Sequence, residues 1–378
     1  MISEHRNHID LSILIAVLTL MLLSLGIVYS ASASYAEFRS GDSERMLTSH
    51  AIKVLLGIFG MFLFMRIDYT KLKHITKLAV ILAVVLLGVT LALGGEMKGA
   101  TRFLRYSGFG LQPSEFAKYA LLFHLCTLLA TKQEFVHDLK KSFIPMMIWI
   151  GLITTLVMAQ PNFSMGTVIF MLSLTLLFIG NVKIKHLVLA FVALLPLIFI
   201  YMISAEYRLK RVLDFVNGVG GGHAKPDYQA WQSIIGFGNG GIFGRGPGES
   251  IQRDFFLPES YGDFVFSIVG EEYGFLGTMF FMLIFLFIMY RGFKIAKFAP
   301  DPFGRYLSIA ITSAVTFYAL INAGVTLGIL PTTGLPMPFV SYGGSSMLFS
   351  SCAIGVLLNI SAQTDLHPRA REVPIMVR

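Results

Sequence analysis

Ten long apolar runs, separated by mostly short polar segments, dominate the pattern of this 378-residue chain. Roughly 20 apolar residues are enough for an α-helix to cross a bilayer. Pro161 separates the fifth run from the sixth, because proline cannot continue a helix. The pattern predicts ten transmembrane helices, near residues 11–30, 51–65, 76–94, 114–130, 143–159, 165–180, 187–203, 263–290, 306–328 and 345–361.

The composition fits the same class of protein. Hydrophobic residues make up 55% of the chain, charged residues only 14%, and the mean hydropathy is +0.70. Soluble domains usually carry about a quarter charged residues, so a soluble globular fold is excluded. We therefore predict an all-α polytopic membrane protein, with one integral membrane domain over residues 1–378. No small-residue cleavage site follows the first run, which we interpret as a retained span.

Basic residues in the short loops predict the orientation. Lys and Arg gather in the loops on the side of both termini, and the alternate loops hold far fewer. By the positive-inside rule, both termini and a tail at about 362–378 are cytoplasmic. The net charge of +8 is then mainly a topology signal and not a sign of nucleic-acid binding. The long segment at about 204–262, between the seventh and eighth helices, becomes an extracytoplasmic loop.

This orientation places every unusual polar motif at the outer face. Within the long loop, residues 216–248 are rich in glycine, but no G-x-x-x-x-G-K-[ST] motif occurs there. We interpret Gly236–Gly246 as a flexible loop close to the bilayer, because loops of this length are usually functional. Neither the nine histidines nor Cys126 and Cys352 have metal-binding spacing, and the cysteines are expected to be small core residues.

Asp263 is the strongest candidate for chemistry, because it lies where the long polar loop meets the eighth apolar run. A carboxylate at that boundary can reach a water-soluble group and a lipid-borne group together. Ser267 and Glu271 follow it along roughly one helical side, and buried carboxylates in membranes usually face a cavity or a partner. The structural alternative is that Asp263 caps the helix, a position that aspartate favours.

Glu115 and Lys118 form the second candidate pair, at the start of the fourth run after Pro113. Residues three apart share a helix face, so the pair is either a structural ion pair or a site at which Lys118 binds a phosphate. Arg102 and Arg105, in the preceding outer loop, would add positive charge for a diphosphate, although a solvated basic loop explains them nearly as well.

The segment from Gly334 to Ser346 is apolar, yet two prolines and a glycine pair interrupt it. Non-helical backbone at this position must be buried in protein or line a cavity. We therefore expect the segment, with its Ser341-Tyr-Gly-Gly344 turn, to form a wall of the same outer cavity.

These motifs together resemble the SEDS family (shape, elongation, division and sporulation), over nearly the whole chain. Residues 333–339 and 356–361 resemble its division members more than its elongation members. The motifs that carry the resemblance are Lys98-Gly-Ala-Thr-Arg-Phe103, Gln112-Pro-Ser-Glu-Phe-Ala-Lys118, Gly240-Gly-Ile-Phe-Gly-Arg-Gly246, Leu257-Pro-Glu259, Asp263-Phe-Val-Phe266, Gly270-Glu-Glu-Tyr-Gly274 and Leu335-Pro-Met-Pro-Phe-Val-Ser-Tyr-Gly-Gly-Ser-Ser346.

The resemblance implies a peptidoglycan glycosyltransferase of the bacterial cytoplasmic membrane. Such an enzyme polymerises lipid II, releases undecaprenyl diphosphate, and works with a class B penicillin-binding protein and other divisome or elongasome proteins. The family's essential acid matches Asp263, as the catalytic residue or as a ligand of Mg²⁺ or Mn²⁺, with no nucleotide cofactor. The expected substrate-binding residues are Arg102, Gln112, Ser114, Glu115, Lys118, Ser341 and Gly343.

Two positions depart from the family pattern. Asn162 stands where members commonly have aspartate after the fifth span, and Ser-Tyr-Gly precedes Asp263 where members often have Ala-His-Thr. Two other functions use the same spans: a lipid II flippase, or a scaffold that only recruits the transpeptidase. The flippase is less favoured, because alternating access favours a site near the midplane and the polar motifs lie at the outer face.

Overall fold

A computed structural model describes residues 8–93, 95–97, 100–106, 109–203, 213 and 227–364 of the chain. A helix occupies each of the ten predicted apolar segments. Seven of the described helices are long and apolar enough to cross a membrane. The helices are α1 (Leu11–Ser40), α2 (Arg45–Arg66), α3 (Tyr69–Leu93), α4 (Pro113–Thr131), α5 (Ile144–Ala159), α6 (Phe163–Ile179), α7 (Ile184–Ile203), α9 (Tyr228–Gly240), α10 (Val265–Lys297), α11 (Pro302–Thr326) and α12 (Gly344–Ser361).

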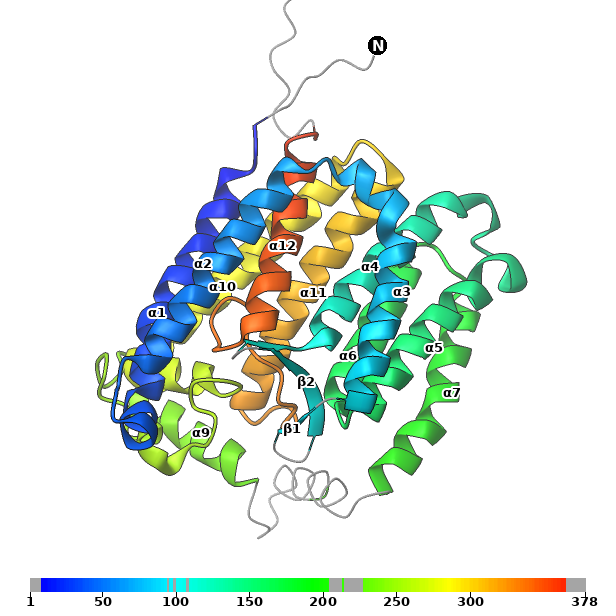
Figure 1. Cartoon of the computed structure of the whole chain (residues 1–378). Helices are drawn as coiled ribbons and strands as arrows, with labels where there is room; N and C mark the ends of the chain where they lie inside the picture. Colours follow the sequence, from blue (N-terminus) through cyan, green and yellow to red (C-terminus); the bar gives the residue numbers. More distant parts are fainter. Residues whose placement is uncertain are drawn as a thin grey trace, which may run out of the picture.

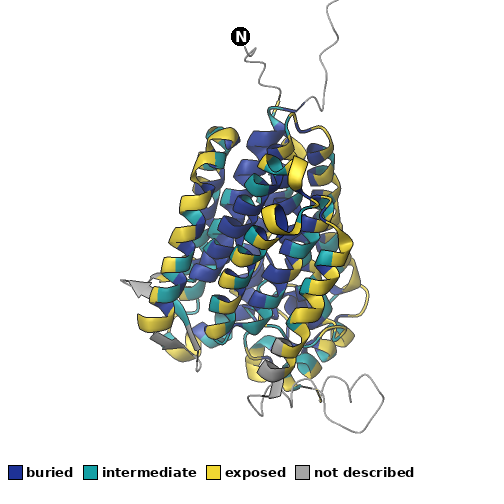
Figure 2. Ribbon diagram, turned by 90° about the vertical axis from the view of Figure 1, so that its right-hand side faces the viewer, coloured by how far each residue is buried: buried dark blue, intermediate teal, exposed yellow. Residues whose placement is uncertain are grey.

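The helices form one bundle around a central pair. Figure 1 shows α11 and α12 in the middle, with both described ends of the chain at the top and α9 at the opposite end. Buried residues lie mainly inside the bundle, while many residues of the outer helices are exposed (Figure 2). Many of these exposed side chains are apolar, such as Leu55, Phe59 and Leu78. Helices that are apolar on the outside as well as the inside are typical of a protein surrounded by lipid.

A small antiparallel sheet corrects the all-α prediction. Its strands are β1 (Gly95–Met97), β2 (Ala100–Tyr106) and β3 (Phe109–Leu111), paired in the order β1-β2-β3. Leu104 pairs with Leu111, and Tyr106 pairs with Phe109. The segment was expected to be a loop because its strands are too short to give an apolar run. Thr101 and the aromatic residues Phe103, Tyr106 and Phe109 favour extended backbone.

The predicted flexible loop at Gly236–Gly246 is also corrected. Its first half is the end of α9, which packs tightly on α10. A Cβ atom on Gly240 would lie 2.0 Å from the carbonyl oxygen of Gly270, so the glycine permits a contact between two backbones. The glycines that suggested flexibility are therefore required for close packing.

The helical backbone of α10 is interrupted at Gly274, and the segment that follows α9 packs against the interruption. Gly274 has φ 64° and ψ −161°, which an L side chain would not adopt without strain. The N–H groups of Phe275 and Leu276 donate to the carbonyls of Gly241 and Ile242, at 2.9 and 3.2 Å. The freed backbone groups are thus satisfied by a neighbouring segment, as apolar surroundings require.

Glu271 anchors the segment after α9. Its carboxylate is fully buried and accepts from Asn239 Nδ2 and from the backbone N–H of Gln252, each at 3.0 Å, and from the Ser250 hydroxyl. The sequence predicts that Glu271 faces a cavity or a partner. In the structure its carboxylate faces hydrogen-bond partners within the protein. A buried carboxylate is tolerated because its oxygens are hydrogen-bonded.

We predict that Gly240→Ala destabilises the protein. The added methyl group would clash with backbone at Gly270, and overpacking of this kind typically costs about 1–3 kcal/mol. Gly238→Ala is the matched control, because nothing lies within 4 Å of a Cβ atom there and alanine favours helix over glycine. Thermal unfolding in detergent should show a lower midpoint for Gly240→Ala only. Equal midpoints for the two variants would support the flexible-loop interpretation instead.

Candidate active site

A cavity of about 2520 Å³ opens at the end of the bundle where the strands and α9 lie. The first turns of α2, α4 and α6 line it, together with the end of α1, strand β2 and two non-helical segments at 258–264 and 330–343. Five of the predicted site residues are on its wall: Arg102, Gln112, Glu115, Asp263 and Gly343. Lys118, Ser114 and Ser341 do not line it.

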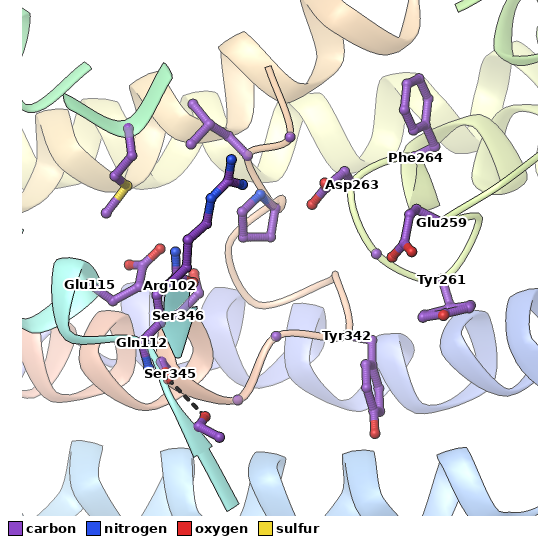
Figure 3. A pocket seen from close by; sticks show the side chains of 18 of the residues that line it. Arg102, Gln112, Glu115, Glu259, Tyr261, Asp263, Phe264, Tyr342, Ser345 and Ser346 are labelled. Atoms are coloured by element: carbon purple, nitrogen blue, oxygen red, sulfur yellow. Dashed lines mark hydrogen bonds between the residues drawn. The ribbon is translucent and has the colours of Figure 1, made fainter. Parts of the chain in front are cut away.

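Asp263 lies in the turn that precedes α10, and its carboxylate points into the cavity (Figure 3). Helix α10 begins at Val265 with Phe264 as its N-cap residue, so the helix-cap alternative for Asp263 is wrong. Asn322 on α11 holds this turn in place. Its Nδ2 donates to the carbonyl oxygens of Asp263, at 2.7 Å, and of Leu335, at 2.8 Å.

The proline-broken segment forms the part of the cavity wall beside the Asp263 turn, and the sequence predicts its place on the wall. Gly334 has φ 68°, and a Cβ atom on it would lie 3.3 Å from Asp263 Oδ2. Glycine suits this position for two reasons: its positive φ strains other residues, and a side chain would crowd the Asp263 carboxylate. Ser341 is buried in the same segment, where its hydroxyl accepts from the N–H of Met337 at 2.8 Å. Its predicted contact with substrate stays a prediction.

Arg102 extends from β2 across one side of the cavity. Its Nη2 donates to the carbonyl oxygen of Pro161, which ties the sheet to the turn between α5 and α6. Asn162 lines the cavity beside it. Arg102 therefore places a guanidinium group on this side of the cavity wall. All of Lys98 and the side chain of Arg105 lie outside the described residues.

Glu115 and Lys118 form an ion pair of 2.8 Å at the start of α4, with each side chain only 1% exposed. Lys118 Nζ also lies 3.9 Å from the ring centroid of Tyr318 and 4.7 Å from that of Tyr119. The lysine is thus enclosed and neutralised, and this geometry favours the structural interpretation of the pair. Glu115 alone reaches the cavity wall. Ser114 is buried, and its hydroxyl has no partner within the described part of the chain.

Gln112 connects the sheet to α12. Its backbone N–H donates to Ser345 Oγ at 2.8 Å, which Figure 3 marks with a dashed line. Gly343 is the residue that precedes α12 and lies on the cavity wall nearby. These contacts hold the first turns of α4 and α12 together, so that both face the cavity.

Sequence reasoning missed a group of residues on the α2 side of the cavity. Lys53 lies with Nζ 3.4 Å from the ring centroid of Tyr342, and Tyr261 stands edge-on to the same ring at 5.8 Å. Burial and the neighbouring Tyr35 raise the pKa of Tyr261 to about 12, so it stays a neutral phenol. The available signal was that Lys53 is an ionisable residue inside a predicted span, which is usually functional.

No group of three or more metal-ligating side chains gathers anywhere in the described part of the chain. Two carboxylates, those of Asp263 and Glu259, line the cavity from one turn. Magnesium is often held by one or two carboxylates with the remaining ligands from water and substrate phosphates. The residues therefore fit a cation that arrives with a diphosphate, and not a closed protein cage.

Solved structures share this arrangement of helices. One, described as "Structural coordination of polymerization and crosslinking by a peptidoglycan synthase complex", matches with a TM-score of 0.76 and 22% identity over 94% of this chain and 98% of that chain. The rod shape determining protein RodA of Thermus thermophilus matches with a TM-score of 0.69 and 22% identity, over 94% of this chain and 97% of its own. At these identities the likeness establishes the fold.

Curated relatives are similar in sequence over almost their full length. The probable peptidoglycan glycosyltransferase FtsW of Geobacter metallireducens is 36% identical over 95% of this chain and 96% of its own. Stage V sporulation protein E of Bacillus subtilis is 35% identical over 92% and 96%. The family model FtsW/RodA/SpoVE, described as "Cell cycle protein", matches residues 10–366. The chain therefore belongs to the FtsW/RodA/SpoVE family, which confirms the resemblance seen in its motifs.

Proposed function

We propose that this protein is a peptidoglycan glycosyltransferase that polymerises lipid II. The observation that carries the proposal is the position of Asp263, which faces a large cavity whose polar end continues into apolar helix faces. Such a cavity suits a substrate with a sugar and diphosphate head and a long isoprenoid tail. The names of the FtsW relatives and their similarity over nearly the whole chain support the same activity.

The proposal includes a topology. All ten apolar segments cross the cytoplasmic membrane, both termini are cytoplasmic, and the cavity opens at the outer face. The bias of basic residues in the short loops supports this orientation. It also explains why no nucleotide cofactor is needed, because a donor at the outer face arrives already activated as a lipid diphosphate.

Asp263 is the general base of the proposed reaction. Its carboxylate accepts the proton of a sugar hydroxyl on the acceptor, and that oxygen attacks the anomeric carbon of the donor. The bond from this carbon to the diphosphate breaks, and undecaprenyl diphosphate leaves with the bonding electrons. A single displacement inverts the anomeric configuration. The hydrogen bonds from Asn322 hold the base in place during the transfer.

Positive charge on the cavity wall stabilises the leaving diphosphate. Arg102 is our candidate, because it lines the cavity and its Nη2 donates to the carbonyl oxygen of Pro161. A bound Mg²⁺ or Mn²⁺ would add charge neutralisation of the diphosphate. Asp263 and Glu259 are the residues that would hold it from the protein side.

We assign the protein to a complex with a class B penicillin-binding protein, the transpeptidase, in the divisome. The similar solved structure of a peptidoglycan synthase complex supports such a partner. The division role is supported by the FtsW relatives, at 32–36% identity over nearly the whole chain. Membrane lipid surrounds the exposed apolar faces of the helices.

We predict that Asp263→Asn lowers lipid II polymerisation at least about 10²-fold, because the amide cannot accept the hydroxyl proton. The measurement uses labelled lipid II with the purified protein and its transpeptidase partner, with and without a chelator. Asp254→Asn is the control, because Asp254 is an exposed acid in the same outer segment that does not line the cavity. It should leave polymerisation unchanged.

The same variants separate the proposed enzyme from its alternatives. Undiminished polymer formation by Asp263→Asn would refute the role of Asp263. A flippase would still move lipid II across liposome membranes without Asp263. A scaffold would support growth with Asp263→Asn, while substitutions on its exposed helix faces would abolish growth.

We predict that the pair Glu115–Lys118 is structural. Lys118→Met alone leaves the Glu115 charge buried without its partner and should cost about 3–5 kcal/mol of stability. The double variant Glu115→Gln/Lys118→Met removes both charges and should recover most of that loss. Thermal unfolding of the two single variants and the double variant measures the coupling. A stable double variant that no longer binds undecaprenyl diphosphate would instead establish the phosphate role of Lys118.

A further inference from the structure

We propose that a groove between α6 and α7 binds phosphatidylglycerol, with an acyl chain in the groove and the anionic phosphate among the lysines at its mouth. The site lies outside the cavity that Asp263 faces, and it does not depend on the proposed glycosyltransferase activity. We call it the α6–α7 groove and define it by six of its lining residues: Leu174, Phe178, Ile184, Leu187, Val188 and Phe191.

The α6–α7 groove is apolar and faces outward. Its volume of about 330 Å³ is within the range of pockets that bind small ligands. Its α7 residues follow a spacing of three and four, so they form one face of that helix. Thr175, the one polar residue in its lining, donates to the carbonyl oxygen of Met171 in its own helix at 2.8 Å. The groove therefore suits a hydrocarbon chain.

The mouth of the groove is the turn between α6 and α7. Helix α6 lines the cavity with residues up to Leu172, and it lines the groove with residues from Leu174 onward. Two exposed lysines, Lys183 and Lys185, flank Ile184 at the start of α7. Figure 1 shows α7 at the edge of the bundle. A phospholipid whose chain fills the groove has its phosphate beside this turn, because head groups stay in the polar layer of the membrane.

The connection between α4 and α5 brings more lysines to the same place. The rings of Phe143, in this connection, and His186, in the first turn of α7, have centroids 5.2 Å apart. Lys132 Nζ donates to the carbonyl oxygen of Lys141 at 2.7 Å, which ties the end of α4 to the connection. Two chain segments thus bring five lysines to one area: Lys132, Lys140, Lys141, Lys183 and Lys185.

The acids in this area do not neutralise the lysines. Glu134 and Asp138 form no salt bridge with a lysine within the part of the chain that the structure describes. Asp138 Oδ1 instead accepts from the backbone N–H groups of Lys140 and Lys141, at 2.8 and 3.0 Å. The N–H of Lys141 is the main cause that lowers the pKa of Asp138, and the charges of Lys141 and Lys183 contribute. Lys183 therefore lies close to the connection between α4 and α5.

Lysines at this end of the bundle follow from the predicted topology, so their charge alone indicates no binding site. The distinguishing feature is that they surround the mouth of an apolar groove. A phospholipid joins an anionic phosphate to hydrocarbon chains in one molecule, which matches this combination. Basic pockets between transmembrane helices bind anionic head groups in the same way.

The test uses phosphatidylglycerol that carries a photoreactive diazirine in one acyl chain. The full chain is placed in phosphatidylcholine nanodiscs with this lipid and irradiated, and the labelled peptides are identified by mass spectrometry. We expect the label to concentrate within residues 174–191. Phosphatidylcholine with the same photoreactive chain should label this range about tenfold less or weaker still, the difference expected for a charged hydrogen bond.

Two double variants test the lysines. Lys183→Gln/Lys185→Gln removes two charges at the mouth of the groove and should lower the labelling of residues 174–191 about tenfold. Lys183→Arg/Lys185→Arg keeps the charges and should retain the label. Lys294→Gln/Lys297→Gln is the matched control, because it removes two lysines from the last turn of α10, outside the groove. It should leave the labelling unchanged.

Two single variants test the groove itself. Val188→Trp places a large side chain in the groove and should exclude the acyl chain. Leu189→Trp is its control, because Leu189 is exposed on the same helix but does not line the groove. The lysine variants, all at the surface, keep the test decisive even if Val188→Trp fails to fold.

Three results would overturn the inference. The first is equal labelling by the two photoreactive lipids, and the second is equal labelling of Lys183→Gln/Lys185→Gln and the unmodified chain. The third is a label that added lipid II removes and added phosphatidylglycerol does not, which would show that the groove binds an isoprenoid diphosphate instead. None of these measurements involves Asp263, so the proposed function stands or fails separately in the polymerisation assay.

Discussion

The wall around Asp263 depends on one buried amide. Asn322 donates two hydrogen bonds from α11, one to the turn that carries Asp263 and one to the segment that carries Leu335. Both segments are non-helical, and such backbone is tolerated in a membrane protein only where it is buried or lines a cavity. A further bond, from the N–H of Tyr342 to the carbonyl of Tyr261, joins the same two segments. The position of the turn that carries Asp263, the proposed catalytic residue, is therefore fixed by hydrogen bonds among α11, this turn and the segment of Leu335 and Tyr342.

A second constraint fixes the chain that leads into the Asp263 turn. Helix α10 opens at Gly274, and residues 241–246 satisfy the exposed backbone groups. Glu271, fully buried, collects hydrogen bonds from Asn239, Ser250 and Gln252 on the same chain segment. A segment pinned at so many points is rigid, so the turn that follows it starts from a fixed position. The polar groups that seem costly at this depth are what hold the outer part of the site to the bundle.

Much of the fold follows from the apolar pattern, because each helix needs a run of apolar residues to be buried or to face lipid. The pattern could not show the sheet, since β1 and β3 have only three residues each and the seven residues of β2 do not alternate between apolar and polar. Glycine was ambiguous: Gly240 looked like a source of flexibility, while its missing side chain actually permits backbone contact with Gly270. Helix ends were also poorly predicted, as α1 continues to Ser40, past the expected end at 30, through small residues that interrupt hydropathy without breaking a helix.

The candidate site was predictable where a polar residue stands at the end of a span, as Asp263 and Gln112 do. The role of a charged residue was not predictable where it depends on how deeply its side chain is buried. Spacing alone brings Glu115 and Lys118 together, but only the packing of Tyr318 over the lysine shows that the pair is enclosed. Lys53 escaped notice because the surrounding apolar residues outweighed it in the hydropathy pattern.

The two lysines explain how one cavity can be both stable and receptive to anions. Each is held against an aromatic ring, which limits its motion without discharging it. Where a carboxylate completes the pair and water is excluded, the charge stabilises the bundle and has no capacity left for a ligand. Where the carboxylate is absent and the cavity is open, the same arrangement leaves a fixed positive charge facing the substrate. Ile52 and Leu56 line the cavity beside Lys53 and stay partly exposed, so under the proposed function they keep the tail of a lipid diphosphate out of water.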